Sequence, residues 1–113
     1  MKVVVAFIRP SKEEAVADAL HTLDGLTGAS FTHILGFGRG RGDRSRREFD
    51  EALTGTLPAV RVDVMTTDAL APKVAAVIIE AAHTGNRGDG KVYVLPMDSA
   101  IRISTREHGD DAV

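Results

Sequence analysis

Apolar positions in the first part of the chain form a strand-like run and then a helical stripe. Residues 3–8 are a continuous apolar run rich in β-branched side chains, which predicts a strand covered on both faces. A proline ends this run, and Ser11 and Glu14 then have the spacing of a capping box at the start of a helix. Apolar residues recur at helical spacing as far as Leu23, and residues 30–35 predict a second strand.

The second part of the chain repeats this order of elements. Valines alternate with other side chains over residues 60–65, which predicts a third strand. A second helix is expected to begin near Thr66, with Pro72 in its first turn, where a missing N–H costs little. Residues 92–95 predict a fourth strand, and residues 100–103 predict a short fifth strand.

Two loops and a tail interrupt or follow these elements. A loop over about 37–56 is rich in glycine and charge, and loops of this length inside a domain are usually functional or mobile. A second loop, over about 84–91, separates the second helix from the fourth strand. The C-terminal tail, residues 104–113, is polar.

The order strand, helix, strand, long loop, strand, helix, strand predicts an α+β fold. Two such halves interleave into a ferredoxin-like βαββαβ sandwich, in which a four-stranded antiparallel sheet carries both helices on one face. The length of 113 residues fits a single domain over 1–113. Since the first strand is apolar on both sides, we expect a closed symmetric homo-oligomer to cover the helix-free face.

Composition narrows the class of protein. A hydrophobic fraction of 43% and a charged fraction of 27% are ordinary for a soluble globular domain. A net charge of −2 gives no general attraction to nucleic acid or to an anionic membrane, and no segment approaches the roughly 20 apolar residues that span a bilayer. The absence of cysteine excludes disulfides and thiolate metal sites and fits a reducing cytoplasm.

The loop at 84–91 has the composition of an anion-binding loop. The segment from Gly85 to Lys91 matches the first seven positions of a phosphate-binding P-loop, but Val92 occupies the Ser/Thr position. The loop also leads from a helix into a strand, so a P-loop NTPase is excluded. Its three glycines still allow backbone N–H groups to converge on an anion, and Lys91 adds a positive charge. A flexible turn with Gly85 as the helix cap is an equally open interpretation.

Other candidate residues lie in and before the long loop. Gly36, Phe37, Gly38 and Arg39 are similar to part of a dinucleotide fingerprint, but no helix follows, so they suit either a phosphate contact or a simple loop entry. An arginine cluster then precedes several acidic residues, which favours a solvated arm over a nucleic-acid site, since only Phe37 and Phe49 could stack on bases. The cluster consists of Arg39, Arg41, Arg44, Arg46 and Arg47.

The spacing of polar residues reveals no catalytic arrangement. Arg102, on the expected last strand, is either a surface arginine or a cation close to the strand of Lys91. The four histidines have no metal-ligand spacing, and no nucleophile is paired with a base. We therefore expect no metal site and a protein that is not an enzyme.

The C-terminal half carries the most specific pattern. TGNRGDGKVYVLPMDSAIRIST at 84–105, followed by REHGDDAV, is similar to the segment from the B-loop to the C-terminus of the PII nitrogen-regulatory family. GFGR at 36–39 and LP at 57–58 bracket a loop of the length of that family's T-loop. The resemblance covers residues 1–113.

This resemblance implies a homotrimer with ATP, ADP or AMP in clefts between neighbouring ferredoxin-like subunits. It also implies that the long loop is a mobile T-loop that regulates a partner transporter or enzyme. The nucleotide-binding residues it implies are Gly36, Phe37, Gly38, Arg39, Gly88, Asp89, Gly90, Lys91 and Arg102. The partner-binding loop residues are Arg41, Arg44, Arg46, Arg47 and Phe49.

Two departures from the family pattern concern a small effector. Gly40 stands where the family has a glutamine that helps to hold Mg²⁺ and 2-oxoglutarate, and Ala59 stands where it usually has a lysine that pairs with the 2-oxoglutarate carboxylate. Loss of such a charge partner costs roughly 1.5–3 kcal/mol. We therefore expect weak or absent 2-oxoglutarate sensing, and the resemblance leaves Mg²⁺ open.

Further departures concern modification and the phosphates. Ala52 replaces the tyrosine that is uridylylated in many bacterial members, so this modification is not expected. Ser104 and Asn86 replace basic residues, which favours ADP or AMP over ATP unless Arg87 compensates. Two alternatives stay open: a carbon-metabolism PII-like sensor of ADP or AMP with bicarbonate, and a small ferredoxin-like enzyme acting on nucleotide phosphates.

Overall fold

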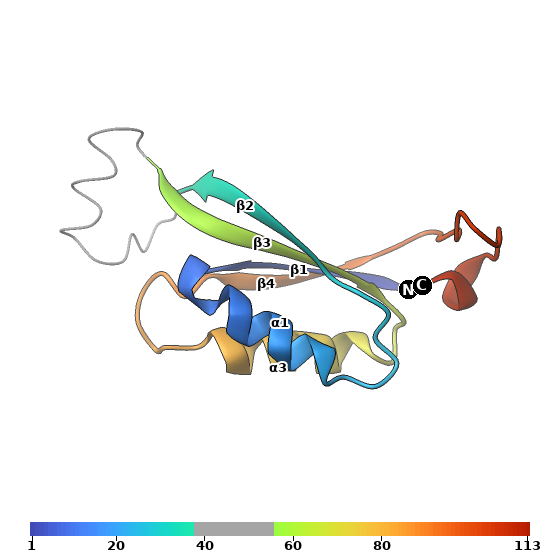
Figure 1. Cartoon of the computed structure of the whole chain (residues 1–113), viewed down its shortest axis with the longest axis horizontal. Coiled ribbons are helices and arrows are strands. Elements are labelled where there is room, and N and C mark those ends of the chain that lie inside the picture. Colours follow the sequence, from blue (N-terminus) through green and yellow to red (C-terminus); the bar gives the residue numbers. More distant parts are fainter. Residues whose placement is uncertain (38–55) are drawn as a thin grey trace.

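The first apolar run lies at the centre of a four-stranded antiparallel sheet (Figure 1). In the computed structural model, β1 (Lys2–Ile8) pairs with β3 (Leu57–Thr66) on one side and with β4 (Lys91–Pro96) on the other. The strand β2 (Ser30–Gly36) pairs with β3, so the order across the sheet is β2-β3-β1-β4. All four predicted strands from the two halves are present.

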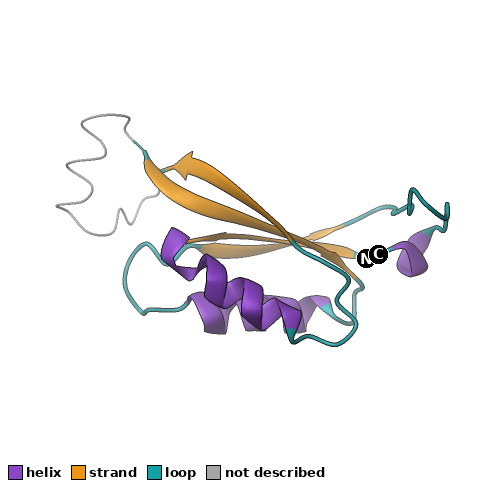
Figure 2. Cartoon of the chain, in the orientation of Figure 1, coloured by secondary structure: helices purple, strands orange, loops and turns teal. Residues whose placement is uncertain are grey.

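The structure describes residues 1–37 and 56–113. Within them, the helices α1 (Glu13–His21) and α3 (Ala71–Ala82) both lie on one face of the sheet (Figure 2). The predicted ferredoxin-like α+β sandwich is therefore confirmed. The predicted long loop over about 37–56 lies outside the described residues apart from its two ends.

The core lies between the sheet and the two helices. Side chains alternate along a strand, so every second residue of β1 and β3 points toward the helices. Both helices place an apolar stripe against this row, and burial of these aliphatic side chains is the main favourable contribution to folding. The buried core comprises Val4, Ala6, Ile8, Val16, Leu20, Val60, Val62, Val64, Ala71, Val74, Ile78 and Ala82.

Both helices begin differently from the predictions. The capping box at Ser11 is wrong, because residues 10–12 form a 3-10 turn and the N-cap is Lys12, with no side-chain hydrogen bond. Proline presets the backbone for this turn, which places Ser11 inside it. Thr66 ends β3, and residues 67–70 form a turn before α3, so that helix starts later than expected. Pro72 lies in its first turn, as predicted.

The predicted fifth strand over 100–103 is wrong. Among the described residues, this segment forms only an isolated bridge between Ile101 and His108. The N–H of Arg106 donates to the carbonyl of Arg102 at 2.7 Å, and Arg106 has a φ of 64°. This tight turn folds the segment against its own tail, which removes it from the sheet. The tail ends in a 3-10 turn, Gly109–Ala112.

The helix-free face of the sheet carries apolar side chains that are partly exposed. Met65, Tyr93 and Leu95 lie there, with 45–47% of each exposed. The rings of Phe7 and Tyr93 pack edge to face with centroids 6.1 Å apart, and the Arg61 guanidinium lies 5.8 Å from the centroid of Phe7. A face of this kind is typical of an interaction surface.

The two ends of the sheet differ in what they carry. The end of β2, the start of β3 and the loop between α3 and β4 lie at one end (Figure 1). Both chain termini lie at the other end (Figure 1). There the Met1 ammonium donates to Asp68 at 2.7 Å, and Met97 N–H donates to the Met1 carbonyl at 3.1 Å. Residues after β4 are therefore separated from the loop before β4 by the length of that strand.

The core predicts a contrast between two adjacent isoleucines of α3. Ile78 is fully buried, whereas 55% of Ile79 is exposed. Ile78→Ala should lower the free energy of unfolding by about 2–5 kcal/mol through lost burial and a cavity. Ile79→Ala should lower it by less than about 1 kcal/mol. Denaturant unfolding at one fixed protein concentration measures both, and equal losses would contradict this description of the core.

Candidate phosphate-binding site

The loop between α3 and β4 has a backbone that only glycine adopts easily. The helix ends at Ala82, and His83 is its C-cap in an extended conformation. Gly85, Gly88 and Gly90 then have φ values of 88°, 93° and 101°. Side chains at these positions would strain the backbone, so the three glycines specify the path of the loop.

The carboxylate of Asp89 organises the loop from within. Its Oδ2 accepts hydrogen bonds from the N–H groups of Thr84 at 2.8 Å and Gly85 at 2.9 Å. Its Oδ1 accepts the Thr84 hydroxyl and the Nε–H of Arg9, the latter at 3.1 Å. These bonds, first those of the Thr84 hydroxyl and N–H and then those of Gly85 and Arg9, hold the pKa of Asp89 well below its usual range. Asp89 is therefore charged and tied into its own loop.

The tip of the loop keeps its backbone donors available. The N–H of Asn86 donates to the Thr84 hydroxyl at 3.1 Å. Within residues 1–37 and 56–113, the N–H groups of residues 87–90 make no hydrogen bond. Successive free N–H groups in a glycine-rich turn form a concave site for an anion. The predicted anion-binding composition of this loop thus has a matching backbone geometry.

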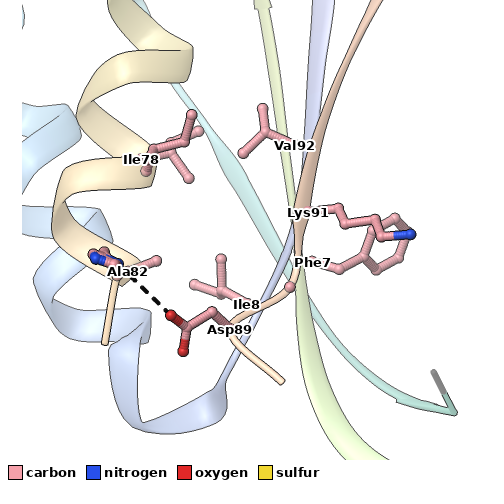
Figure 3. A pocket seen from close by; sticks show the side chains of 10 residues that line it. Phe7, Ile8, Ile78, Ala82, Asp89, Lys91 and Val92 are labelled. Carbon is pink, nitrogen blue, oxygen red and sulfur yellow. Dashed lines mark ion pairs between the residues drawn. The ribbon is translucent and has the colours of Figure 1, made fainter. Parts of the chain in front are cut away.

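Gly90 joins this loop tightly to the sheet. A Cβ atom at this position would lie 1.7 Å from the carbonyl oxygen of Phe7. Lys91 follows as the first residue of β4 and pairs with Phe7 across the sheet. Figure 3 shows the side chains of Phe7 and Lys91 on the side of the strands away from Ile78, so both lie on the helix-free side. Among the described residues, Lys91 has no ion-pair partner.

Arg9 is a member of the site that was not predicted from the sequence. It follows β1, and its Nη2 donates to the carbonyl of Arg87 at 2.5 Å, while its Nε donates to Asp89. The antiparallel pairing of β1 with β4 in the ferredoxin-like sheet is the signal that could have located it. It brings the residue after one strand next to the loop before the other.

A cleft of about 270 Å³ lies beneath this loop on the helix side. Its walls are mainly apolar and include Ile8, Ile78 and Val92 (Figure 3), and His83 and Asp89 also line it. The His83 Nδ1 and the Asp89 carboxylate are 3.8 Å apart. Gly90 and Lys91 also line the cleft, so the loop contributes to its wall.

The structure describes seven of the predicted site residues, which lie around the glycine loop, at the end of β2 and after β4. Gly88, Asp89, Gly90 and Lys91 lie together in the loop. Gly36 and exposed Phe37 lie at the end of β2, at the same end of the sheet (Figure 1). Seven others lie outside the described residues: Gly38, Arg39, Arg41, Arg44, Arg46, Arg47 and Phe49.

Arg102 lies apart from the loop within one subunit. It follows the far end of β4, its N–H donates to the Glu107 carbonyl at 3.0 Å, and its Nη1 lies 3.8 Å from the Glu107 carboxylate. The segment that contains it lies at the end of the sheet with the termini (Figure 1). One chain therefore does not bring Arg102 to Lys91.

The described part of the chain lacks two further features, a metal-ligand cluster and a membrane-spanning helix. No group of three or more His, Asp or Glu side chains there is arranged to hold a metal ion. Gly40, which bears on the open Mg²⁺ question, is not in that part. No described helix is long and apolar enough to cross a membrane.

The fold and the glycine loop define a small ferredoxin-like protein with a glycine-rich turn before its last strand. The model of the family described as "Nitrogen regulatory protein P-II" matches residues 1–107. Proteins of that name from Azospirillum brasilense and Rhodospirillum rubrum are 39% and 40% identical, over 100% of both chains. The chain therefore belongs to the P-II family of nitrogen regulatory signal-transduction proteins, which confirms the resemblance.

A solved structure supports the same assignment. The crystal structure of Arabidopsis thaliana PII bound to citrate superposes with a TM-score of 0.80 and is 30% identical. The alignment covers 99% of this chain and 91% of that one. The similarity thus extends over the whole subunit and not over one half alone.

The close approach at Gly90 predicts a strong effect of a single methyl group. Gly90→Ala should lower the free energy of unfolding by about 1–3 kcal/mol, because it adds backbone strain and meets the Phe7 carbonyl. Gly28→Ala is the matched control, since nothing lies within 4 Å of a Cβ there. Thermal or denaturant unfolding measures both variants. A Gly90→Ala protein as stable as Gly28→Ala would show that the loop does not rest on β1.

Proposed function

We propose that this protein is a homotrimeric signalling protein that binds an adenine nucleotide at each subunit interface and regulates a partner protein. The observation that carries the proposal is the row of N–H groups at 87–90 beside the ammonium of Lys91, none of which has a partner in the part of the chain that the structure describes. Such a loop suits a phosphate chain, because fixed donors and a cation face it without reorganisation. The inference that the nucleotide carries an adenine base rests on membership of the P-II family.

The separation of Arg102 from Lys91 supports a site shared between subunits. A second subunit, related by symmetry, could bring its own Arg102 end to the loop of the first. The exposed apolar residues of the helix-free face, Met65, Tyr93 and Leu95, supply a surface for such packing. We therefore propose that the site is complete only in the trimer, where two neighbouring subunits contribute to it.

The output of this site is proposed to be regulatory and not catalytic. The loop over about 37–56 would present Arg41, Arg44, Arg46, Arg47 and Phe49 to a transporter or enzyme in the cytoplasm. Gly36 and Phe37 place the base of that loop at the same end of the sheet as the phosphate loop (Figure 1). A bound nucleotide could therefore influence the loop directly.

Two versions of this function differ in the small effector that is sensed together with the nucleotide, which is either 2-oxoglutarate or bicarbonate. Ala59, in β3 opposite Ile34, offers no charge to a dicarboxylate. This disfavours a 2-oxoglutarate sensor and keeps bicarbonate open as the small effector. The related Arabidopsis structure holds citrate, so a small polycarboxylate belongs in the same screen.

The binding test is calorimetry with ATP, ADP and AMP, each alone and with 2-oxoglutarate, bicarbonate or citrate. Lys91→Ala should weaken nucleotide binding severalfold or more, because the loop loses its direct cation. Light scattering should still give the mass of a trimer for this variant. Lys73→Ala, which removes the same charge from the exposed start of α3, is the control and should bind as the unchanged protein does.

Two results would reject the proposal. Failure of all three adenine nucleotides to bind would remove nucleotide sensing. Unchanged affinity in Lys91→Ala would mean that the phosphates lie elsewhere. Slow nucleotide hydrolysis that is lost in Lys91→Ala would instead favour the alternative of a small ferredoxin-like enzyme.

A further inference from the structure

An arginine outside the loop between α3 and β4 is hydrogen-bonded to two residues of that loop. Arg9, at the end of β1, donates through Nε to Asp89 at 3.1 Å and through Nη2 to the Arg87 carbonyl at 2.5 Å. Its side chain and that of Asp89 are only 24% and 23% exposed, so this pair is partly shielded from water. The two bonds connect residues that are 80 and 78 positions apart in the sequence.

The contact also fixes the electrostatic character of the loop. Asp89 is negative and lies one residue from Gly88 and Gly90, where a phosphate is proposed to bind. Arg9 offsets this charge, so the loop keeps Arg87 and Lys91 as cations without an ion-pair partner among the described residues. Without Arg9, the Asp89 carboxylate would repel each added phosphate charge at short range.

The shape of the guanidinium suits this task. Separate nitrogens of the planar guanidinium donate to two acceptors, a carboxylate and a carbonyl. The single nitrogen of a lysine cannot reproduce this arrangement. The same group lies against the loop backbone, because a Cβ atom at Gly88 would be 3.3 Å from Nη2. Gly88 therefore gives the guanidinium room, and the guanidinium fixes the carbonyl that precedes Gly88.

We propose that Arg9 is a positioning residue of the nucleotide site, and that it makes the loop selective for polyphosphates. It cancels Asp89 and fixes the backbone of Arg87, so that Arg87 and Lys91 together meet ATP or ADP better than AMP. This inference rests on the proposed nucleotide-binding function. Arg87 then compensates for the missing basic residues at Asn86 and Ser104.

The test compares Arg9→Ala with the unchanged protein by calorimetry at one ionic strength. Arg9→Ala should lower the affinity for ATP about tenfold and the affinity for AMP by less than about threefold, with the effect on ADP between the two. The reason is that repulsion from Asp89 grows with the charge of the phosphate chain. Lys73→Ala, with the same loss of charge, should bind all three as before. Light scattering establishes that each variant is still a trimer.

Arg9→Lys keeps the positive charge near Asp89 but lacks the planar guanidinium. It therefore distinguishes the effect of the charge from the effect of the guanidinium geometry. It should lower the affinity for ATP about threefold, as expected for one lost hydrogen bond, and leave the affinity for AMP unchanged. If Arg9→Ala does not fold, this variant alone carries the test, and ATP binding equal to that of the unchanged protein would overturn the proposal.

The outcomes distinguish the two proposals. If the unchanged protein binds none of the nucleotides, the proposed function fails and the role of Arg9 fails with it. If the unchanged protein binds them and Arg9→Ala has no effect, or weakens ATP and AMP equally, only the role of Arg9 is wrong.

Discussion

The hydrogen bonds that Asp89 accepts are the constraint on which the rest of the site depends. They hold the N–H groups of Thr84 and Gly85 and the side chain of Arg9 at one carboxylate. The near end of the loop is satisfied in this way, whereas the N–H groups of residues 87–90 have no hydrogen-bond partner within 1–37 and 56–113 and would be available to a ligand. A flexible glycine turn would lose more conformational freedom on binding than this fixed loop.

The subunit separates its two groups of phosphate-binding candidates along the sheet. The loop with Lys91 lies at the end of the sheet where β2 stops and β3 starts, whereas Arg102 lies near the termini (Figure 1). A site that needs both ends must combine two subunits, so ligand binding and assembly would be linked. The apolar helix-free face is consistent with this, since it gives subunits a reason to associate independently of the ligand.

The sequence predicted the elements well and the contacts between them poorly. Runs such as residues 3–8 and the alternating valines of β3 report burial directly, so four strands and two helices were placed within a few residues. The errors at Ser11 and at residues 100–103 arose where a local turn competes with regular structure. The pairing of Arg9 with Asp89 spans 80 positions, and only the order of strands in the sheet could have indicated it.

Amide hydrogen exchange of the protein with and without ADP tests this arrangement most directly. We expect the N–H groups of residues 87–90 to gain protection when ADP binds, because they become donors to phosphate. Those of Thr84 and Gly85 should change little, since Asp89 already accepts them. Bound ADP that leaves residues 87–90 exchanging as before would contradict the account.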